Sequence, residues 1–374
     1  MSKDDDVTIP SSEGEEDTDG SLADMKKVME TQITCEKTGK KKSYWSVAME
    51  TMGMAGGKDG EGDLWLEDVN QGIPMLKKYI KDKDLQLAEE KEQAKKNKFP
   101  FNSFMDLVPL DEFHTTQTNF LKAFLKWATK DQEDVVEGSE NAKLVVNASK
   151  ARRRLDSYFD WMKDNMASDL AENPLTLDSV KDAAKAWGLE ASHTKDNQLA
   201  WWFDLEKMDY EALKTVPAKE QLRYVVWYSH LVIFDHKAQD NGVLLMEDLN
   251  KIGFWNAMTL IPLELSAKMD RFTIGVVPVK MKGIYAFGCA RWMHLMVGLM
   301  KPFMSKKMRD RMFVITDSTA PDKQKYLDDL VGRDSIPERF MGLDGGSPPD
   351  VLIKRLAKKG KKKAENKSKE EGEK

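Results

Sequence analysis

The segment Ile284–Met304, IYAFGCARWMHLMVGLMKPFM, decides how the rest of this chain is interpreted. Its opening IYAF is a short apolar run typical of a buried strand, and the part from Ala290 onward has the composition of a helix. That helix is apolar around most of its circumference but carries Arg291, His294 and Lys301. A helix with so wide an apolar surface needs a core to cover or an apolar partner to contact.

Two further apolar runs flank this segment and predict a parallel sheet. Val243–Leu249, VLLMEDL, precedes it, and Met312–Thr316 follows it. Helical segments separate the three predicted strands, which is the pattern of βαβ units around a parallel sheet. Phe272–Val277 is ambiguous, because its β-branched residues favour a strand although it lies between a helix and Pro278.

Residues 99–190 have the pattern of a helical subdomain. Apolar side chains recur at helical spacing around Phe120 and Phe124, and again around Tyr158 and Phe159. A third predicted helix, 175–186, ends near a glycine, which is a common stop signal. We therefore predict helices here and a mostly parallel sheet in residues 191–343.

The two ends of the chain carry opposite charge. Residues 1–30 are predominantly acidic and residues 344–374 predominantly basic, so we expect two disordered tails. Residues 31–98 are expected to form a poorly defined extension, whose aromatic residues suggest partial order, followed by a charged segment, Lys81–Lys98, that is either an exposed helix or a linker. The net charge of −5 is a small difference between these opposed ends and gives little information about partners.

Cysteine usage and hydropathy indicate a cytoplasmic protein. Cys35 and Cys289 lie in very different contexts, so we expect a reducing compartment rather than a disulfide framework. The start MSKDDDV has no basic and apolar signal region. The longest apolar run, Ile284–Met300, is interrupted by charge and is too short to span a bilayer, which needs about 20 apolar residues.

No pattern in the chain predicts an enzyme. The histidines have no metal-ligand spacing and are His114, His193, His230, His236 and His294. Cys289 has apolar neighbours that do not activate a thiol. Because there is also no glycine-rich phosphate loop and no serine nucleophile motif, we expect no catalytic residue, no cofactor and no metal site.

An ordered series of elements within Gly242–Gly342 supports a family assignment. The series contains Leu245–Leu249 with its acidic Asp248, a turn at Pro278, the strand Ile284–Phe287, a helix ending in Lys301-Pro302-Phe303, the strand Arg311–Thr316 and the closing element Ile336–Gly342. In this order the chain resembles the CRAL-TRIO lipid-binding domain. That family contains retinal- and tocopherol-binding proteins and yeast-type phosphatidylinositol transfer proteins.

The resemblance implies an α/β fold with an N-terminal helical subdomain, a mostly parallel sheet flanked by helices and an apolar gating helix. It also implies a lipid bound in an internal pocket and transferred or presented between membranes. The side chains expected to line the pocket and its gate are Trp292, Met293, Leu295, Met296, Val297, Leu299, Met300 and Phe303. The alternative is that this segment is an ordinary core helix with one polar stripe.

The basic side chains that could contact a lipid headgroup are Arg311, Arg291 and Lys301. The phosphatidylinositol-transfer branch of the family has a glutamate where this chain has Val279, which cannot accept a hydrogen bond from an inositol hydroxyl. We therefore expect a ligand other than phosphatidylinositol.

The expected partners are a lipid and, transiently, a membrane surface, with no nucleic acid. The densest positive cluster consists of Lys358, Lys359, Lys361, Lys362 and Lys363, and it could bind anionic lipid or act as a solubilising or targeting tail. The alternative function is an adaptor of the same fold that binds a protein partner through its N-terminal extension and exchanges no lipid.

Overall fold

The computed structural model describes most of the chain. The described residues are 22–34, 41–44, 46–47, 62–93, 99–130, 145–204, 208–249, 261–288, 294, 297, 306–316, 322–341 and 350–372.

A five-stranded sheet forms the centre of the protein. Its strands, in spatial order, are β5 (Glu190–His193), β6 (Leu199–Asp204), β7 (Val243–Asp248), β8 (Met281–Phe287) and β9 (Met312–Ile315). β5 pairs with β6 antiparallel, and every other pair is parallel. The predicted mostly parallel sheet is confirmed, although the sequence analysis did not identify β5 and β6.

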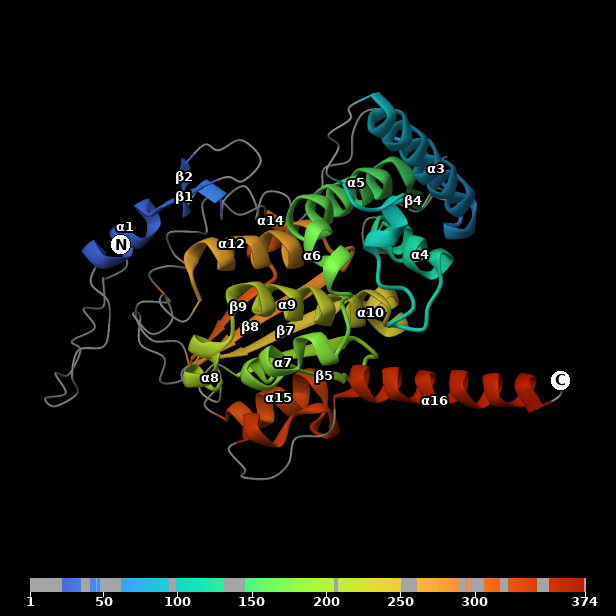
Figure 1. Cartoon of the computed structure of the whole chain (residues 1–374). Coiled ribbons are helices and arrows are strands. Elements are labelled where there is room, and N and C mark those ends of the chain that lie inside the picture. Colours follow the sequence, from blue (N-terminus) through green and yellow to red (C-terminus); the bar gives the residue numbers. More distant parts are fainter. Residues whose placement is uncertain are drawn as a thin grey trace, which may run out of the picture.

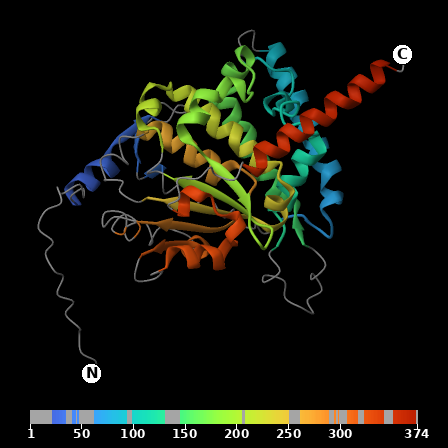
Figure 2. The same ribbon diagram turned by 90° about the horizontal axis from the view of Figure 1, so that it is seen from below.

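Helices cover both faces of the sheet, which gives three layers (Figures 1 and 2). One face packs against α15 (Lys323–Val331) and the side chains of Ile336 and Phe340. The other face lies beneath α9 (Ala218–Ile233) and α12 (Leu263–Asp270). β7 lies between β6 and β8, so neither of its edges is open. The exposed fraction of its side chains therefore depends on how completely the helices cover each face of the sheet.

The predicted helical subdomain is also confirmed. Within the predicted bounds its elements are η1 (Phe104–Leu107), α4 (Gln117–Trp127), α5 (Ala148–Asn165), α6 (Ala167–Glu172), η3 (Asp178–Val180) and α7 (Lys181–Trp187), and α3 (Val69–Gln93), which precedes those bounds, packs with them. Side-chain oxygens of Thr116 and Asn147 accept hydrogen bonds from backbone N–H groups at the starts of α4 and α5, which fixes where these helices begin. Buried aromatic rings then join the two helices, as Phe120 lies 5.1 Å from Tyr158 between centroids.

The remaining elements are short. They are β1 (Gln32–Thr34), β2 (Lys41–Ser43), β3 (Trp65–Leu66), β4 (Val146–Asn147), α8 (Tyr210–Thr215), α10 (His236–Asn241), α14 (Lys306–Arg309), η6 (Arg333–Ser335) and η7 (Glu338–Met341). The strands β1 and β2, and likewise β3 and β4, form antiparallel pairs outside the main sheet.

Residues 31–98 are more ordered than the sequence analysis predicted. Of the two alternatives for Lys81–Lys98, an exposed helix or a linker, the structure has the helix as far as Gln93, where α3 ends. Ile73, Leu76, Ile80 and Leu87 are buried on one face of α3 and join the core of the helical subdomain. The high charge of the segment concealed this apolar stripe, whose spacing is that of an amphipathic helix.

The predicted disorder of the two tails is also corrected in part. α1 (Leu22–Glu30) lies within the expected acidic tail, and its Val28 is buried. α16 (Val351–Gly372) occupies most of the expected basic tail. The start of α16 is docked on the body, because Leu352 is fully buried and Asp350 caps the helix. The composition of the tails did not reveal these buried residues, because most of the side chains around them are charged.

One ion pair and two hydrogen bonds hold α16 in place. Arg355 forms an ion pair with Asp235 and donates a hydrogen bond to the carbonyl of Leu231 at 3.1 Å. Tyr228 donates a hydrogen bond from its hydroxyl to the carboxylate of Asp350. The helix then projects beyond the body (Figure 2).

The ambiguous segment Phe272–Val277 is not a strand. It overlaps a π-helix, η4 (Arg271–Val276), that continues from α12. The guanidinium of Arg154 on α5 donates hydrogen bonds to the carbonyls of Ile274 at 2.8 Å and Val277 at 2.9 Å, and also to that of Gly275. Arg154 is 5% exposed, and burial lowers its pKa to about 9. This side chain ties the helical subdomain to the layer above the sheet.

Replacing Arg154 by lysine should destabilise the protein by about 2–4 kcal/mol, because an ammonium centred on one atom cannot reach all three carbonyls that the two terminal guanidinium nitrogens bond. Urea unfolding of the full-length chain measures the effect. The control is Arg152→Lys on the same helix, at an exposed position, which should change the free energy of unfolding by less than about 0.5 kcal/mol. Equal stability of the two variants would contradict the role given to Arg154.

Candidate functional site

The two faces of β7 differ in how fully they are covered. Leu244 and Met246 point towards α15 and are 3% and 0% exposed. Leu245 and Glu247 point to the other face and keep part of their surface accessible, even though β7 is a central strand. Parallel register places Leu245 beside Ile284 of β8 and Trp201 of β6. The helix-side face, which lies beneath α9 and α12, is therefore covered less completely at Leu245 and Glu247 than the opposite face, although Val243 on the same face is fully buried.

A pair of carboxyl groups lies on this helix-side face. Glu247 comes from β7, and Asp270 comes from the end of α12 above it. Burial, with a smaller contribution from the charge of Asp270, raises the pKa of Glu247 to about 7. Burial alone raises the pKa of Asp270 to about 6. Both side chains are enclosed by protein yet keep accessible surface, as side chains that line an internal space do.

The N-terminal extension reaches the same place. The hydroxyl of Tyr44 is hydrogen-bonded to Ser266 of α12, one helical turn before Asp270. Burial, and then the charge of Asp270, raises the pKa of Tyr44 to about 12, while the bond to Ser266 opposes that rise. The backbone N–H of Tyr44 donates to the carbonyl of Thr31 at 2.8 Å, which anchors the segment.

This arrangement places a small polar spot in an otherwise apolar surface. A carboxyl group with a pKa near neutrality is partly protonated at pH 7, so it can donate as well as accept a hydrogen bond. Because the charge of Asp270 acts on Glu247, the titration of the two groups is linked. The pair could therefore orient one hydroxyl, carbonyl or amine group of a ligand lying on the apolar surface around Leu245.

The gate predicted from the sequence lies almost entirely outside the described residues. Trp292, Met293, Leu295, Met296, Leu299, Met300 and Phe303 are in this group, as are the headgroup candidates Arg291 and Lys301. Two residues of the segment are described, and both are helical: His294 is exposed and Val297 is buried. The assignment of these residues to a gate remains a prediction.

Arg311, the third headgroup candidate, lies at the amino end of the parallel strands. Its guanidinium donates a hydrogen bond to the carbonyl of Met281 at 2.6 Å and so joins the starts of β8 and β9. Glu247, by contrast, lies near the carboxyl end of β7. The structure does not bring Arg311 together with the carboxyl pair.

The lysines of the basic cluster lie on α16. Lys358, Lys361, Lys362 and Lys363 are exposed, while Lys359 is partly buried. Burial, with a further contribution from Arg355, lowers the pKa of Lys359. Four of the five predicted tail lysines thus face solvent from one helix.

Two other polar residues named in the sequence analysis, Asp248 and His230, make contacts that stabilise the fold. Asp248 pairs with Lys323 of α15, whose ammonium also lies 5.5 Å from the ring centroid of Phe287, so this acid joins β7 to α15. His230 is fully buried and contacts the hydroxyl of Tyr158 at 2.7 Å. Burial lowers the pKa of His230 to about 4, so it is a neutral core histidine.

Sequence reasoning missed Glu247 and Asp270. A signal for Glu247 was present in VLLMEDL. In a strand, Glu247 lies on the same face as Leu245, whereas Asp248 lies on the opposite face. No comparable signal marked Asp270, whose position depends on how α12 packs over the sheet.

Within the described part of the chain, no three His, Cys, Asp or Glu side chains are arranged to hold a metal ion. No described helix is long and apolar enough to cross a membrane.

The raised pKa of Glu247 predicts a pH-dependent difference in stability. Because its pKa is higher in the folded state, the folded protein binds more protons between about pH 4.5 and pH 7, and the stability contribution of this group is lost as the pH rises through that range. Glu247→Gln should remove this loss and stabilise the protein at pH 8 by about 1–3 kcal/mol relative to the parent. Urea unfolding from pH 4.5 to 8 measures it.

The control for this experiment is Glu264→Gln, an exposed position on α12. Its difference from the parent protein should stay constant with pH. A constant difference for Glu247→Gln as well would contradict the burial of an ionisable group at this position.

Comparison with known proteins identifies the domain that carries these features. The sequence profile of the CRAL/TRIO domain family matches residues 190–342, which contain the whole sheet and both carboxyl groups. No curated protein sequence gives a significant match. One solved structure, titled "Crystal structure of Sfh5", aligns with 68% of this chain and 94% of its own at 10% identity, with a TM-score of 0.31. Residues 190–342 of this chain therefore form a CRAL/TRIO domain.

Proposed function

We propose that this protein binds a hydrophobic lipid on the helix-side face of its sheet and transfers or presents that lipid between membranes. The observation that carries the proposal is the incomplete cover of the apolar face at Leu245, within a domain of the CRAL/TRIO family. No chemical step is needed, and the proposed setting is the cytoplasm with transient contact to a membrane surface.

Burial of an acyl chain is sufficient to drive binding at such a face. Each buried CH₂ contributes about 0.8 kcal/mol, so a chain of some sixteen carbons could supply roughly 10 kcal/mol before the costs of ordering. A few polar contacts are then enough to choose among lipids. Glu247 and Asp270 are the described groups on this face that could make them.

The chemistry of these groups favours a particular class of lipid. Carboxylates repel a phosphate, whereas a carboxyl group can hydrogen-bond a hydroxyl or carbonyl oxygen. Val279, which is partly buried and packs against the main core, offers no acceptor for an inositol hydroxyl. We therefore propose a neutral or sparsely hydroxylated lipid, or an isoprenoid-like hydrophobe, in preference to phosphatidylinositol.

A charge in the proposed gate should abolish lipid exchange. Met296→Asp would put an unpaired carboxylate on an apolar helix face, and transfer of a fluorescent lipid between vesicles should fall by about 10-fold or more. The matched control is Met75→Asp at a position on α3 that is 38% exposed, and it should transfer lipid normally. Thermal unfolding of both variants shows whether the fold is kept.

Normal transfer by Met296→Asp would remove this helix from the mechanism. The same assay, run with phosphatidylinositol, phosphatidylcholine and a tocopherol-like molecule as competitors, tests the ligand class. Clear preference for phosphatidylinositol would show that the inference from Val279 is wrong. A protein that transfers none of them but retains a protein partner would favour the adaptor function.

The lysines of α16 are proposed to bring the carrier to anionic membranes. Deleting the whole helix would also remove the Arg355–Asp235 ion pair, so neutralising exposed lysines is the cleaner change. The double variant Lys361→Gln, Lys362→Gln should bind anionic vesicles about 30-fold more weakly at low salt, at roughly 1 kcal/mol per lysine.

The matched control for the tail is Lys77→Gln, Lys78→Gln, two exposed lysines on α3. Vesicle sedimentation compares the two proteins, and lipid loading should be unchanged in both. If the two double variants bind anionic vesicles equally, α16 is not a membrane contact.

A further inference from the structure

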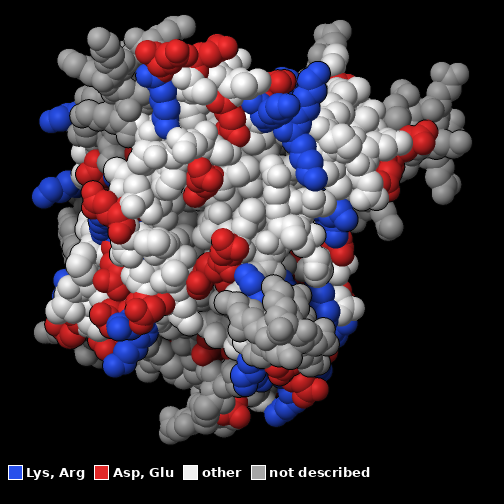
Figure 3. Space-filling model, turned by 45° about the vertical axis from the view of Figure 1, so that its right-hand side comes forward, with Lys and Arg blue, Asp and Glu red and all other residues white. Residues whose placement is uncertain are grey.

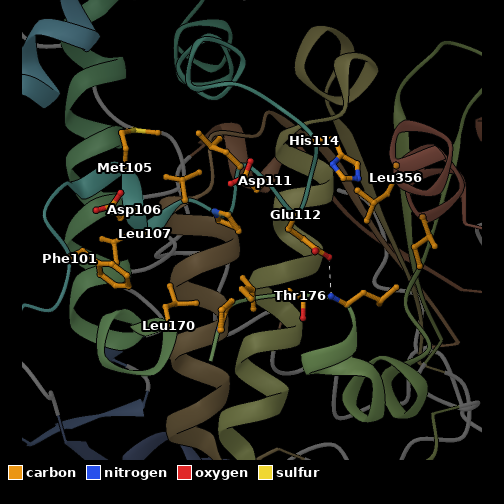
Figure 4. A pocket seen from close by; sticks show the side chains of 18 of the residues that line it. Phe101, Met105, Asp106, Leu107, Asp111, Glu112, His114, Leu170, Thr176 and Leu356 are labelled. Carbon is orange, nitrogen blue, oxygen red and sulfur yellow. Dashed lines mark hydrogen bonds between the residues drawn. The ribbon is translucent and has the colours of Figure 1, made fainter. Parts of the chain in front are cut away.

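A groove of about 970 Å³ lies apart from the sheet, on the helical subdomain. One wall comes from η1 and the turn after it, and a second comes from the end of α6 and the loop that follows (Figure 4). The third wall is α16. This volume is at the upper end of the range of small-molecule sites, which is roughly 300–1,000 Å³.

α16 lines the groove with one face. Ile353, Leu356, Ala357 and Gly360 follow the i, i+3, i+4, i+7 spacing of a helical stripe. A side chain at position 360 would lie 3.1 Å from Nε2 of His114, so glycine lets α16 approach this closely. His114 has a φ of 47° and therefore stands in a left-handed turn against the helix.

The walls of the groove are mostly apolar and partly accessible. Aliphatic and aromatic side chains face it from three elements, including Phe101, Met105, Leu170 and Leu356 (Figure 4). Leu177 lines it as well and is 37% exposed, which makes it one of the few large apolar side chains on the described surface. Such a cluster at a concave site is typical of a binding surface.

The charge of the groove has one sign. Asp106, Asp111 and Glu112 line it, and the described lining residues include no lysine or arginine. In Figure 3 the corresponding side of the molecule shows isolated acidic groups within a largely uncharged area. Three carboxylates beside apolar walls would repel a phosphate or a fatty-acid carboxylate and attract a cationic, amphipathic ligand.

The three acids differ in how much of their bonding capacity is already used. Glu112 accepts hydrogen bonds from the backbone N–H of Leu177 at 3.0 Å and from the indole of Trp227 at 3.1 Å. Asp106 accepts one from the backbone N–H of Ser103 at 3.0 Å. Asp111 is exposed, and no described residue pairs with its carboxylate. Asp111 is thus positioned to receive a cation from a partner.

We infer that this groove docks a basic amphipathic segment of a partner protein. Apolar side chains of the segment would enter between the helical subdomain and α16, and its lysines or arginines would reach Asp111 and its acidic neighbours. This is the pattern of an amphipathic helix in a groove, with apolar anchors inside and charge complementarity at the rim. The site is distinct from the proposed lipid-binding face and does not depend on lipid binding.

The test uses a fluorescent 14-residue synthetic helix with leucines at i, i+3, i+4 and i+7 and lysines on the opposite face. Anisotropy of this peptide with the full-length protein should show saturable binding that weakens with salt. Two control peptides, one with glutamates in place of lysines and one with serines in place of leucines, should bind at least about 10-fold more weakly.

Protein variants locate the binding to the groove. Asp111→Lys should weaken binding about 5- to 10-fold and reduce its salt dependence. Leu177→Ser should weaken it about 5-fold by removing an apolar contact. The matched controls are Asp334→Lys and Leu85→Ser, exposed positions outside the groove, and they should bind the peptide like the parent protein.

The result can overturn the inference in three ways. Equal binding of the lysine and glutamate peptides would remove the charge argument. Equal affinity of each groove variant and its control would place the peptide elsewhere. Binding of a fluorescent fatty acid, cis-parinaric acid, in the groove, together with no binding of the peptide, would assign the groove to lipid. Circular dichroism of every variant confirms that the fold is retained.

Discussion

The central strand β7 needs cover on both faces, and the rest of the structure depends on how that cover is provided. Its side chains alternate between the faces, so Met246 packs in the buried cluster with α15, while Leu245 lies on the opposite face and packs against Ile284 and Met308. On the first face, buried side chains form a hydrophobic cluster that includes Trp202. The second keeps accessible apolar surface and two enclosed acids, and this asymmetry makes lipid binding the best-supported function.

Distant segments hold the incompletely covered layer in position. Arg154, from the helical subdomain, bonds the carbonyls of η4 at the end of α12, and Tyr44 from the N-terminal extension reaches Asp270 at the same end. A buried guanidinium with several carbonyl partners is costly to rearrange, so α12 is fixed relative to the sheet. α16, held by Arg355, extends this framework and supplies a wall of the separate acidic groove.

The sequence predicted the elements with strong local patterns and missed those defined by tertiary contacts. The apolar run from Val243 marked β7 plainly, whereas β6, LAWWFD, has the same length but follows a tight turn, and its pairing cannot be read from spacing. The docked start of α16 was hidden because Leu352 is one apolar anchor in a lysine-rich segment. The sequence contained a signal for Glu247, which shares a strand face with the apolar Leu245. Asp270 comes near Glu247 only in the folded protein.

Native mass spectrometry of the full-length protein, purified without detergent, tests the central claim most directly. Our account predicts a fraction of molecules with the extra mass of one lipid, released on collisional activation. Leu245→Trp should abolish this species by filling the space above β7, while the control Met75→Trp should keep it. A folded protein found only at its bare mass, even after incubation with a total lipid extract, would contradict the account.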